Sequence, residues 1–177
     1  MRMRASRKYT GIRRQVHRQL KTLWRREPGL DSVTEGEFRS IGDSFKRGDF
    51  RCVPLVGKLQ NLVCGLRITI IRREKPGQIM RKTGDLDNRL KKLLDALRIP
   101  DEEQLTRVHP EEGETPFFCL LEDDNLVTGF DVTTEQLLEP VSPDGNEADV
   151  VAIITAEIWP TRITAWTERF LGGILTR

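Results

Sequence analysis

Residues 149–159, DVVAIITAEIW, form the clearest strand pattern in the chain, because β-branched and apolar residues dominate them. Residues 62–71, LVCGLRITII, have the same character. Between these two stretches, residues 86–98 predict a helix. Its leucines lie on one side: Leu86, Leu90, Leu93, Leu94 and Leu97. Strands and helices that alternate in this way predict an α/β (α+β) fold, in which a small mixed β-sheet packs with helices.

The remaining segments have weaker patterns. An apolar stripe predicts an N-terminal helix that Thr10 caps and Pro28-Gly29 ends; it consists of Tyr9, Ile12, Val16, Leu20, Leu23 and Trp24. Residues 29–50 read as a loop with a short helical piece, and residues 100–116 as an exposed acidic loop. Residues 117–121 and 126–132 indicate two short strands, and residues 163–172 a short C-terminal helix.

The size and composition fit one domain. The chain has 177 residues, of which 37% are hydrophobic and 32% charged, so we expect a single domain over residues 1–177. Within it, we expect a basic amphipathic helix at 1–28 and a core at 60–160. Apolar runs are too short to cross a membrane, and the three cysteines form no CxxC pair. With no secretion signal, this pattern favours free thiols and a cytoplasmic location.

Charge is distributed unevenly along the sequence. Residues 1–98 carry a net charge of +15 and residues 99–158 a net charge of −15. A basic segment of this kind favours a polyanionic partner, and nucleic acid is the first candidate. The alternative is that the two segments fold together and neutralise each other.

Two pairs of acidic residues suggest a metal site. Asp85 and Asp87 flank Leu86 where an extended approach would turn into a helix, so both carboxylates can converge on one point. Carboxylate oxygens suit Mg²⁺ or Mn²⁺, and a third ligand from Asp123-Asp124 would complete an open site for phosphodiester hydrolysis. Lys91 lies one helical turn after Asp87, where it can hold a phosphate. Further cations surround the acids as candidate DNA-binding residues: Arg81, Lys82, Arg89 and Lys92.

Each of these features also has an ordinary structural explanation. Asp and Asn are common caps at helix starts, a lysine four residues after an aspartate is a common surface pair, and Asp-Asp-Asn is a common turn. His17 and His109 have no metal-ligand companion nearby, and Cys64 fits a small core residue.

The pattern resembles the RusA-like Holliday junction resolvases. The matching block is D-L-D-N-x-x-K-x-x-x-D-A-L, followed by a D-D pair before a strand. It comprises Asp85, Leu86, Asp87, Asn88, Lys91, Asp95, Ala96 and Leu97, with Asp123 and Asp124 as the second pair. The resemblance implies a small homodimeric endonuclease, often encoded by prophages, that resolves four-way DNA junctions. It also implies that Asp85, Asp87 and Asp124 bind Mg²⁺ and that Lys91 takes part in catalysis.

We therefore expect a Mg²⁺-dependent, structure-selective DNA endonuclease that acts as a homodimer on branched DNA. Two helices are candidates for the dimer interface: the N-terminal stripe, and the C-terminal segment with Trp166 and Phe170. An alternative is a catalytically inactive DNA-binding module of the same fold, and another is an unrelated α/β domain whose acids are caps and turns. Proximity of Asp124 to Asp85 or Asp87 would distinguish the enzyme from the other two.

Overall fold

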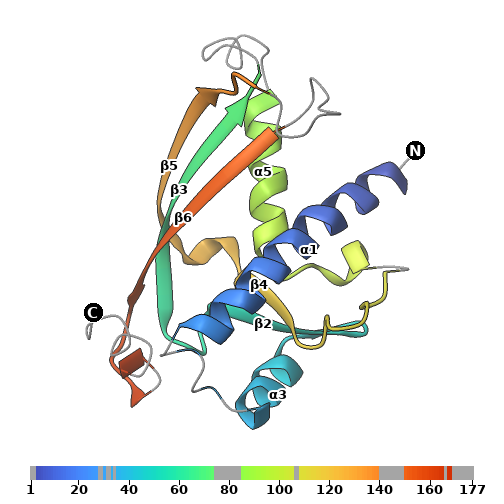
Figure 1. Ribbon diagram of the computed structural model, residues 1–177. Coiled ribbons are helices and arrows are strands. Elements are labelled where there is room, and N and C mark those ends of the chain that lie inside the picture. Colours follow the sequence, from blue (N-terminus) through green and yellow to red (C-terminus); the bar gives the residue numbers. More distant parts are fainter. Residues whose placement is uncertain are drawn as a thin grey trace.

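A computed structural model describes residues 3–27, 30, 33, 35–73, 85–105, 108–139, 150–165 and 167–168, without the side chains of residues 3–10 and 85–87. This part of the chain forms an α+β fold of three α-helices and two three-stranded mixed sheets (Figure 1). The expected α+β class is confirmed, but the single small sheet is wrong, because the strands divide into two sheets. Residues 166 and 169–172 of the predicted C-terminal helix lie outside the described residues. No described helix is both long and apolar enough to span a bilayer.

The larger sheet contains the two strands that the sequence marks most clearly. Its central strand is β3 (Leu62–Arg72), which pairs in parallel with β5 (Val127–Gln136) and antiparallel with β6 (Val150–Pro160). Side chains of β3 are buried at every second position from Leu62 to Arg72, so one face of the sheet lies against the core. The opposite face carries the exposed residue Arg67, which contacts Asp131 and Glu157 on the neighbouring strands.

The second sheet has the order β1 (Lys46–Arg47), β2 (Phe50–Val56) and β4 (Phe117–Leu121). β2 was not predicted, because Pro54 interrupts its apolar pattern and proline cannot donate a ladder hydrogen bond. The strand tolerates this residue because β1 pairs only with Phe50 and Arg51, so no described strand pairs with that edge of β2 at Pro54. Upstream, α3 (Glu35–Ser44) is the short helical piece expected within residues 29–50.

α1 (Met3–Arg26) crosses the second sheet and supplies a large part of the core (Figure 1). Its predicted apolar stripe is confirmed: Leu20 and Trp24 are buried, and Val16 and Leu23 pack against the same cluster. Thr10 is not the cap, because the helix begins at Met3 and the intervening residues are good helix formers. The core also includes residues from both sheets, among them Val53 and Leu66, so the two sheets share one apolar interior.

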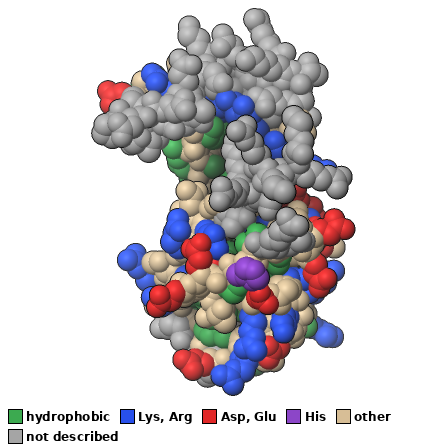
Figure 2. Space-filling model, turned by 90° about the vertical axis from the view of Figure 1, so that its right-hand side faces the viewer, with side chains coloured by type: hydrophobic (Ala, Val, Ile, Leu, Met, Phe, Trp, Pro, Cys, Tyr) green, Lys and Arg blue, Asp and Glu red, His purple; other side chains and the backbone are tan. Residues whose placement is uncertain are grey.

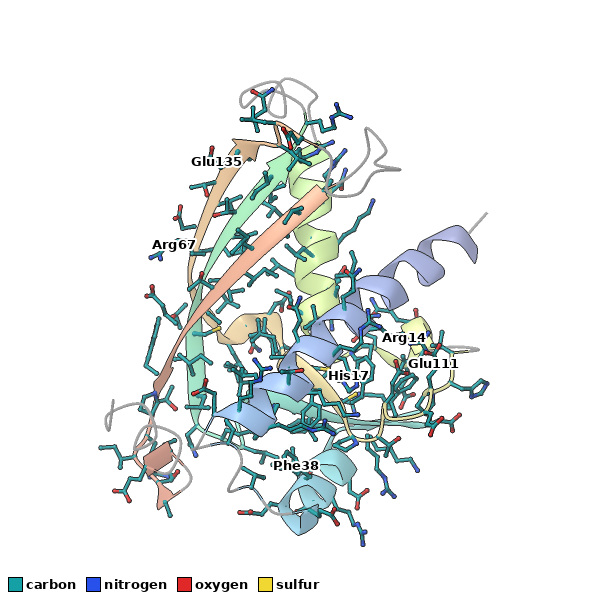
Figure 3. The ribbon with its side chains drawn as sticks, in the orientation of Figure 1. Arg14, His17, Phe38, Arg67, Glu111 and Glu135 are labelled. Atoms are coloured by element: carbon teal, nitrogen blue, oxygen red, sulfur yellow. The ribbon has the colours of Figure 1, made fainter. Side chains whose placement is uncertain are left out.

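The acidic segment 100–116 is not a free exposed loop. It contains η1 (Glu102–Leu105), and its second half lies against α1. Arg14 contacts Glu111 at 2.8 Å and Glu114 at 2.7 Å, and Glu114 is buried (Figure 3). Hydrogen bonding to Arg14 and to the backbone lowers the pKa of Glu114, although burial opposes this shift. The acidic part of the chain therefore neutralises some of the basic part.

His17 is a structural residue of α1. Its side chain is 2% exposed, its ring stacks on Phe117, and its Nδ1 accepts the backbone N–H of Phe118 at 2.9 Å (Figure 3). Burial lowers the pKa of His17, and the positive charges of Lys21 and Arg18 act in the same direction, whereas Glu114 opposes them. By contrast, His109 is exposed and contacts Asp49 at 2.7 Å.

We expect the free energy of unfolding to fall as the pH drops below about 6.5, the ordinary pKa of histidine. Neutral His17 accepts a buried hydrogen bond that the protonated ring cannot accept. The pKa of His17 is lower in the folded protein than in the unfolded chain. The stabilisation is therefore complete at a pH above the unfolded pKa, and it is lost as the pH falls towards the folded pKa. The loss should be about 1 kcal/mol, the net contribution of one hydrogen bond. Urea titrations at pH 7.5 and 5 would measure it.

The matched variants for this measurement are H17Q and H109Q. Glutamine at position 17 keeps an acceptor that does not titrate, so H17Q should lose less stability on acidification than the wild type. H109Q should behave as the wild type does. Equal losses in all three proteins would contradict the assignment to His17.

The three cysteines are free and buried: Cys52, Cys64 and Cys119. Burial raises the pKa of Cys64 to about 11, so its thiol stays protonated at neutral pH. The prediction that Cys64 is a small core residue is confirmed by its place in the main apolar cluster.

Candidate functional site

The matching block occupies α5 (Asp85–Leu97), close to the bounds that the leucine pattern predicts. Ala96 and Leu97 are buried, and Leu93 and Leu94 pack against the main core. Asn88, Lys91 and Lys92 are exposed on the remaining surface of the helix. The block is therefore an amphipathic helix, and its described residues Asn88, Lys91 and Lys92 face solvent.

Asp85 and Asp87 both belong to the first turn of α5. Both residues have a helical backbone, so the extended approach expected at this pair is not found. The side chains of both residues, together with Arg81 and Lys82, lie outside the described part of the chain. Arg89 is half-buried one turn further on.

Asp123 and Asp124 form the start of the short helix η2 (Asp124–Leu126). Asp123 is its N-cap, and its side chain accepts the backbone N–H of Asn125 at 2.9 Å. Leu126 is buried and anchors the turn, whereas Asp124 is exposed. Asp123 thus has the capping role that an Asp-Asp-Asn sequence commonly has, and only Asp124 presents its carboxylate freely to solvent.

The two acidic pairs lie at opposite ends of α5. After the helix, the backbone N–H of Ile99 donates to the carbonyl of Leu121 at 3.0 Å, which places the Asp123 turn beside the last turn of α5. The first turn, with Asp85, is at the other end of the helix, about 20 Å along its axis (Figure 1). One Mg²⁺ ion holds its oxygen ligands at about 2.0–2.1 Å. Within one chain, the backbone does not bring Asp124 to the first turn of α5, so the proximity expected of a single-chain site with three carboxylates is not found.

The turn that carries Asp123 is held firmly. The backbone N–H of Glu122 donates to the carbonyl of Val56 at 2.8 Å, and the Glu122 side chain accepts the backbone N–H of Lys58 at 2.7 Å. These hydrogen bonds tie the turn to β2 and to the residues that follow β2.

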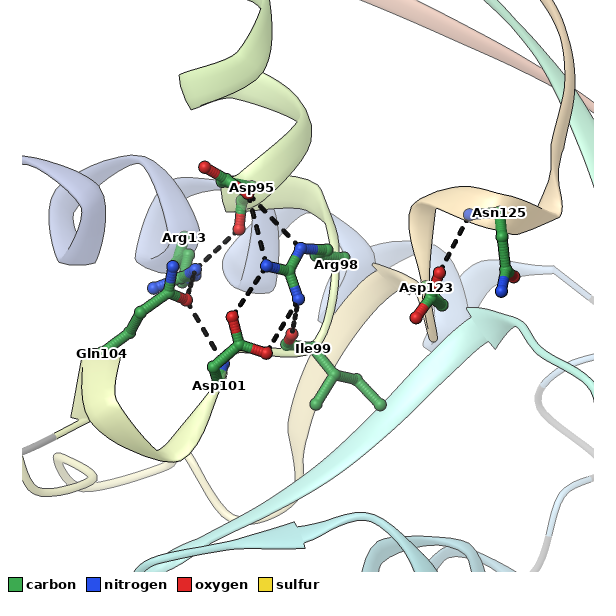
Figure 4. Close-up of polar contacts among 8 residues, drawn as sticks. All are labelled: Arg13, Asp95, Arg98, Ile99, Asp101, Gln104, Asp123 and Asn125. Carbon is green, nitrogen blue, oxygen red and sulfur yellow. Dashed lines mark hydrogen bonds and ion pairs between the residues drawn. The ribbon is translucent and has the colours of Figure 1, made fainter.

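A polar cluster fixes the last turn of α5 (Figure 4). It was not predicted from the sequence. Arg98 contacts Asp95 at 3.4 Å and Asp101 at 2.8 Å, and Arg13 of α1 donates to the backbone carbonyl of Asp95 at 2.6 Å. Hydrogen bonding to Arg98 lowers the pKa of Asp101. Asp95 thus contacts Arg98, not Lys91 or Lys92. In the sequence, only the acidic residues immediately after the helix indicate this cluster. The contribution of Arg13 is not visible there, because Arg13 lies 82 residues before Asp95.

Ion pairs within the chain reduce the predicted basic surface. Arg14 and Arg67 contact four acidic residues of the segment 99–158. Figure 2 shows basic and acidic side chains interspersed on one face of the molecule, without one continuous basic patch among the coloured residues. Among the described residues, no three His, Cys, Asp or Glu side chains form a group that could hold a metal ion. Lys91 and Lys92 are exposed on the same helix whose first turn contains Asp85 and Asp87.

No protein-family model, no curated protein and no solved structure matches the chain.

Proposed function

We propose that the protein is a Mg²⁺-dependent, structure-selective DNA endonuclease that resolves four-way junctions, with its site at the first turns of α5. One observation carries the proposal: the D-L-D-N-x-x-K block forms the start of a single helix whose far end is buried while Asn88, Lys91 and Lys92 are exposed. A substrate as large as DNA requires such an accessible helix face.

The residues of α5 have distinct roles in this proposal. Asp85 and Asp87 would hold the Mg²⁺ ion, because hard cations prefer carboxylate oxygens. The metal, when bound, activates water and neutralises charge on the phosphate. Lys91 would bind the scissile phosphate and stabilise its developing negative charge, and Lys92 would contact the DNA backbone. The positive end of the helix dipole favours the same anion.

A second candidate is a DNA-binding module of this fold that does not cleave. The separation of Asp124 from the first turn of α5 favours it, since Asp85 and Asp87 then lack the third carboxylate that the resemblance implies. Such a module would keep the exposed lysines of α5 and bind branched DNA in the absence of Mg²⁺.

A nicking assay on a four-way junction separates the two candidates. We expect paired nicks with Mg²⁺, none with EDTA, and little cleavage of linear duplex of the same sequence. Binding is measured in parallel by electrophoretic mobility shift with EDTA present. Binding without cleavage would select the second candidate, and neither binding nor cleavage would contradict both.

A further inference from the structure

β6 is an edge strand of the described sheet, and its own residues provide little of the usual protection of such strands. Among the described residues it pairs only with β3, through an uninterrupted register from Val150 to Pro160. The strand holds one charged residue, Glu157, and no proline before its last position. Large apolar side chains are exposed along it: Val150 is 47% exposed, Ile153 53% and Trp159 40%. Soluble proteins normally place charges, prolines or bulges on a free edge, because its unpaired backbone groups bind other strands.

β5, the opposite edge of the same sheet, is protected. It carries the exposed residues Asp131 and Glu135, and a register shift interrupts its pairing with β3 between Cys64 and Gly65. Charges and bulges are the devices that discourage edge pairing. The two edges of one sheet therefore differ, and only β6 is suited to pairing with another strand.

We propose that β6 pairs antiparallel with β6 of a second copy of this chain, which joins two three-stranded sheets into one sheet of six strands. Thr155 is the middle residue of β6. A two-fold axis that passes between the Thr155 residues of the two chains therefore pairs the strand over its full length. Residues directly opposite then lie on the same face of the sheet. On the face towards the core, Ala156 lies opposite Ile154, and Ala152 lies opposite Ile158. Each small side chain thus meets a large one on this face, while on the opposite face Ile153 lies opposite Glu157 and Val151 opposite Trp159.

Symmetry favours a second copy over an open chain of subunits. A two-fold pairing uses both β6 edges at once and leaves only the β5 edges at the ends of the joined sheet. Because Asp131 and Glu135 protect those ends, assembly stops at the dimer.

The structure also removes one of the interfaces expected from the sequence. The apolar stripe of α1 packs against its own chain from Val16 to Trp24, with Leu20 and Trp24 buried, so this part of it is not available to a partner. The other candidate, the segment with Trp166 and Phe170, lies outside the described side chains. The β6 pairing rests on the sheet alone and does not depend on the proposed nuclease activity.

Sedimentation equilibrium of the full chain at micromolar concentration tests the pairing. We expect a mass about twice 20.4 kDa for the wild type. T155E should raise the dimer dissociation constant at least about tenfold, because it places two carboxylates directly opposite each other. Within its own chain, the new side chain lies opposite Arg67 on β3, so the sheet itself should stay intact. T133E is the matched control on β5, and it should leave the dimer unchanged.

Cysteine cross-linking tests the register. Under mild oxidation T155C should form a disulfide between two chains, since the paired positions face each other across the axis. In I153C the two thiols would lie about 13 Å apart along the strand and should not react. The native cysteines are buried. A wild type that stays near 20.4 kDa, a dimer insensitive to T155E, or faster cross-linking at 153 than at 155 would overturn the proposal.

Discussion

D85N and D87N are each expected to lose at least about 100-fold in junction nicking while binding the junction as tightly as the wild type or more tightly. Loss of a residue that only supports a metal ligand commonly costs about 10- to 100-fold, so loss of a ligand itself should cost at least the upper end. Binding should persist because each variant removes negative charge close to the phosphates. Single-turnover nicking and mobility-shift titration measure the two quantities separately.

Controls distinguish a metal ligand from a helix cap. E103Q changes an exposed acid of η1 and should retain wild-type nicking. Circular dichroism should show all variants folded, since exchange of a cap for asparagine has little effect on a helix. Wild-type nicking by D85N and D87N would contradict their assignment, and loss of folding together with binding would assign them a structural role.

D124N then locates the third ligand. Nicking like that of the wild type would assign the site to the first turn of α5 alone. A loss equal to that of D85N would require both ends of α5 to act at one metal ion, either in another arrangement of the chain or across two chains.

The parts of the fold that follow a regular hydrophobic period could be predicted from the sequence. β3, α5, β4 and β6 lie within one or two residues of their expected bounds, because each has a continuous pattern of period 2 or 3.6 or a short apolar run. β2 was missed because Pro54 breaks its pattern, and a two-residue β1 is what lets it stay in the sheet. The division into two sheets depends on pairings over long sequence distances, such as Val53 with Phe118, which no local pattern indicates.

The candidate site was predictable as a set of residue types but not as an arrangement. The sequence indicated acids and lysines at helical spacing, and α5 presents Lys91 and Lys92 to solvent as expected. The distance between the two acidic pairs could not be predicted from the sequence. It depends on the path of residues 99–121, which determines where Asp123 lies. That segment returns only as far as the last turn of α5, where Ile99 and Leu121 are hydrogen-bonded. It also carries Glu111 and Glu114 to Arg14, which is why the charge separation along the chain partly cancels in the fold.

L97A is expected to lower the free energy of unfolding by about 2–5 kcal/mol, the range for a buried leucine truncated to alanine. Leu97 is 1% exposed and belongs to the main core, so its loss leaves a cavity in that core. For a chain of this size the melting temperature should fall by at least about 4 °C, since each kcal/mol shifts it by roughly 2–4 °C. K92A, on the exposed surface of the same helix, is the matched control and should change stability by less than about 0.5 kcal/mol. Calorimetry of the two variants tests whether the core anchors α5, and equal melting temperatures would contradict it. The proposed site depends on this anchor, because the packing of Leu97 in the core fixes the position of α5, the helix that carries Asp85, Asp87 and Lys91.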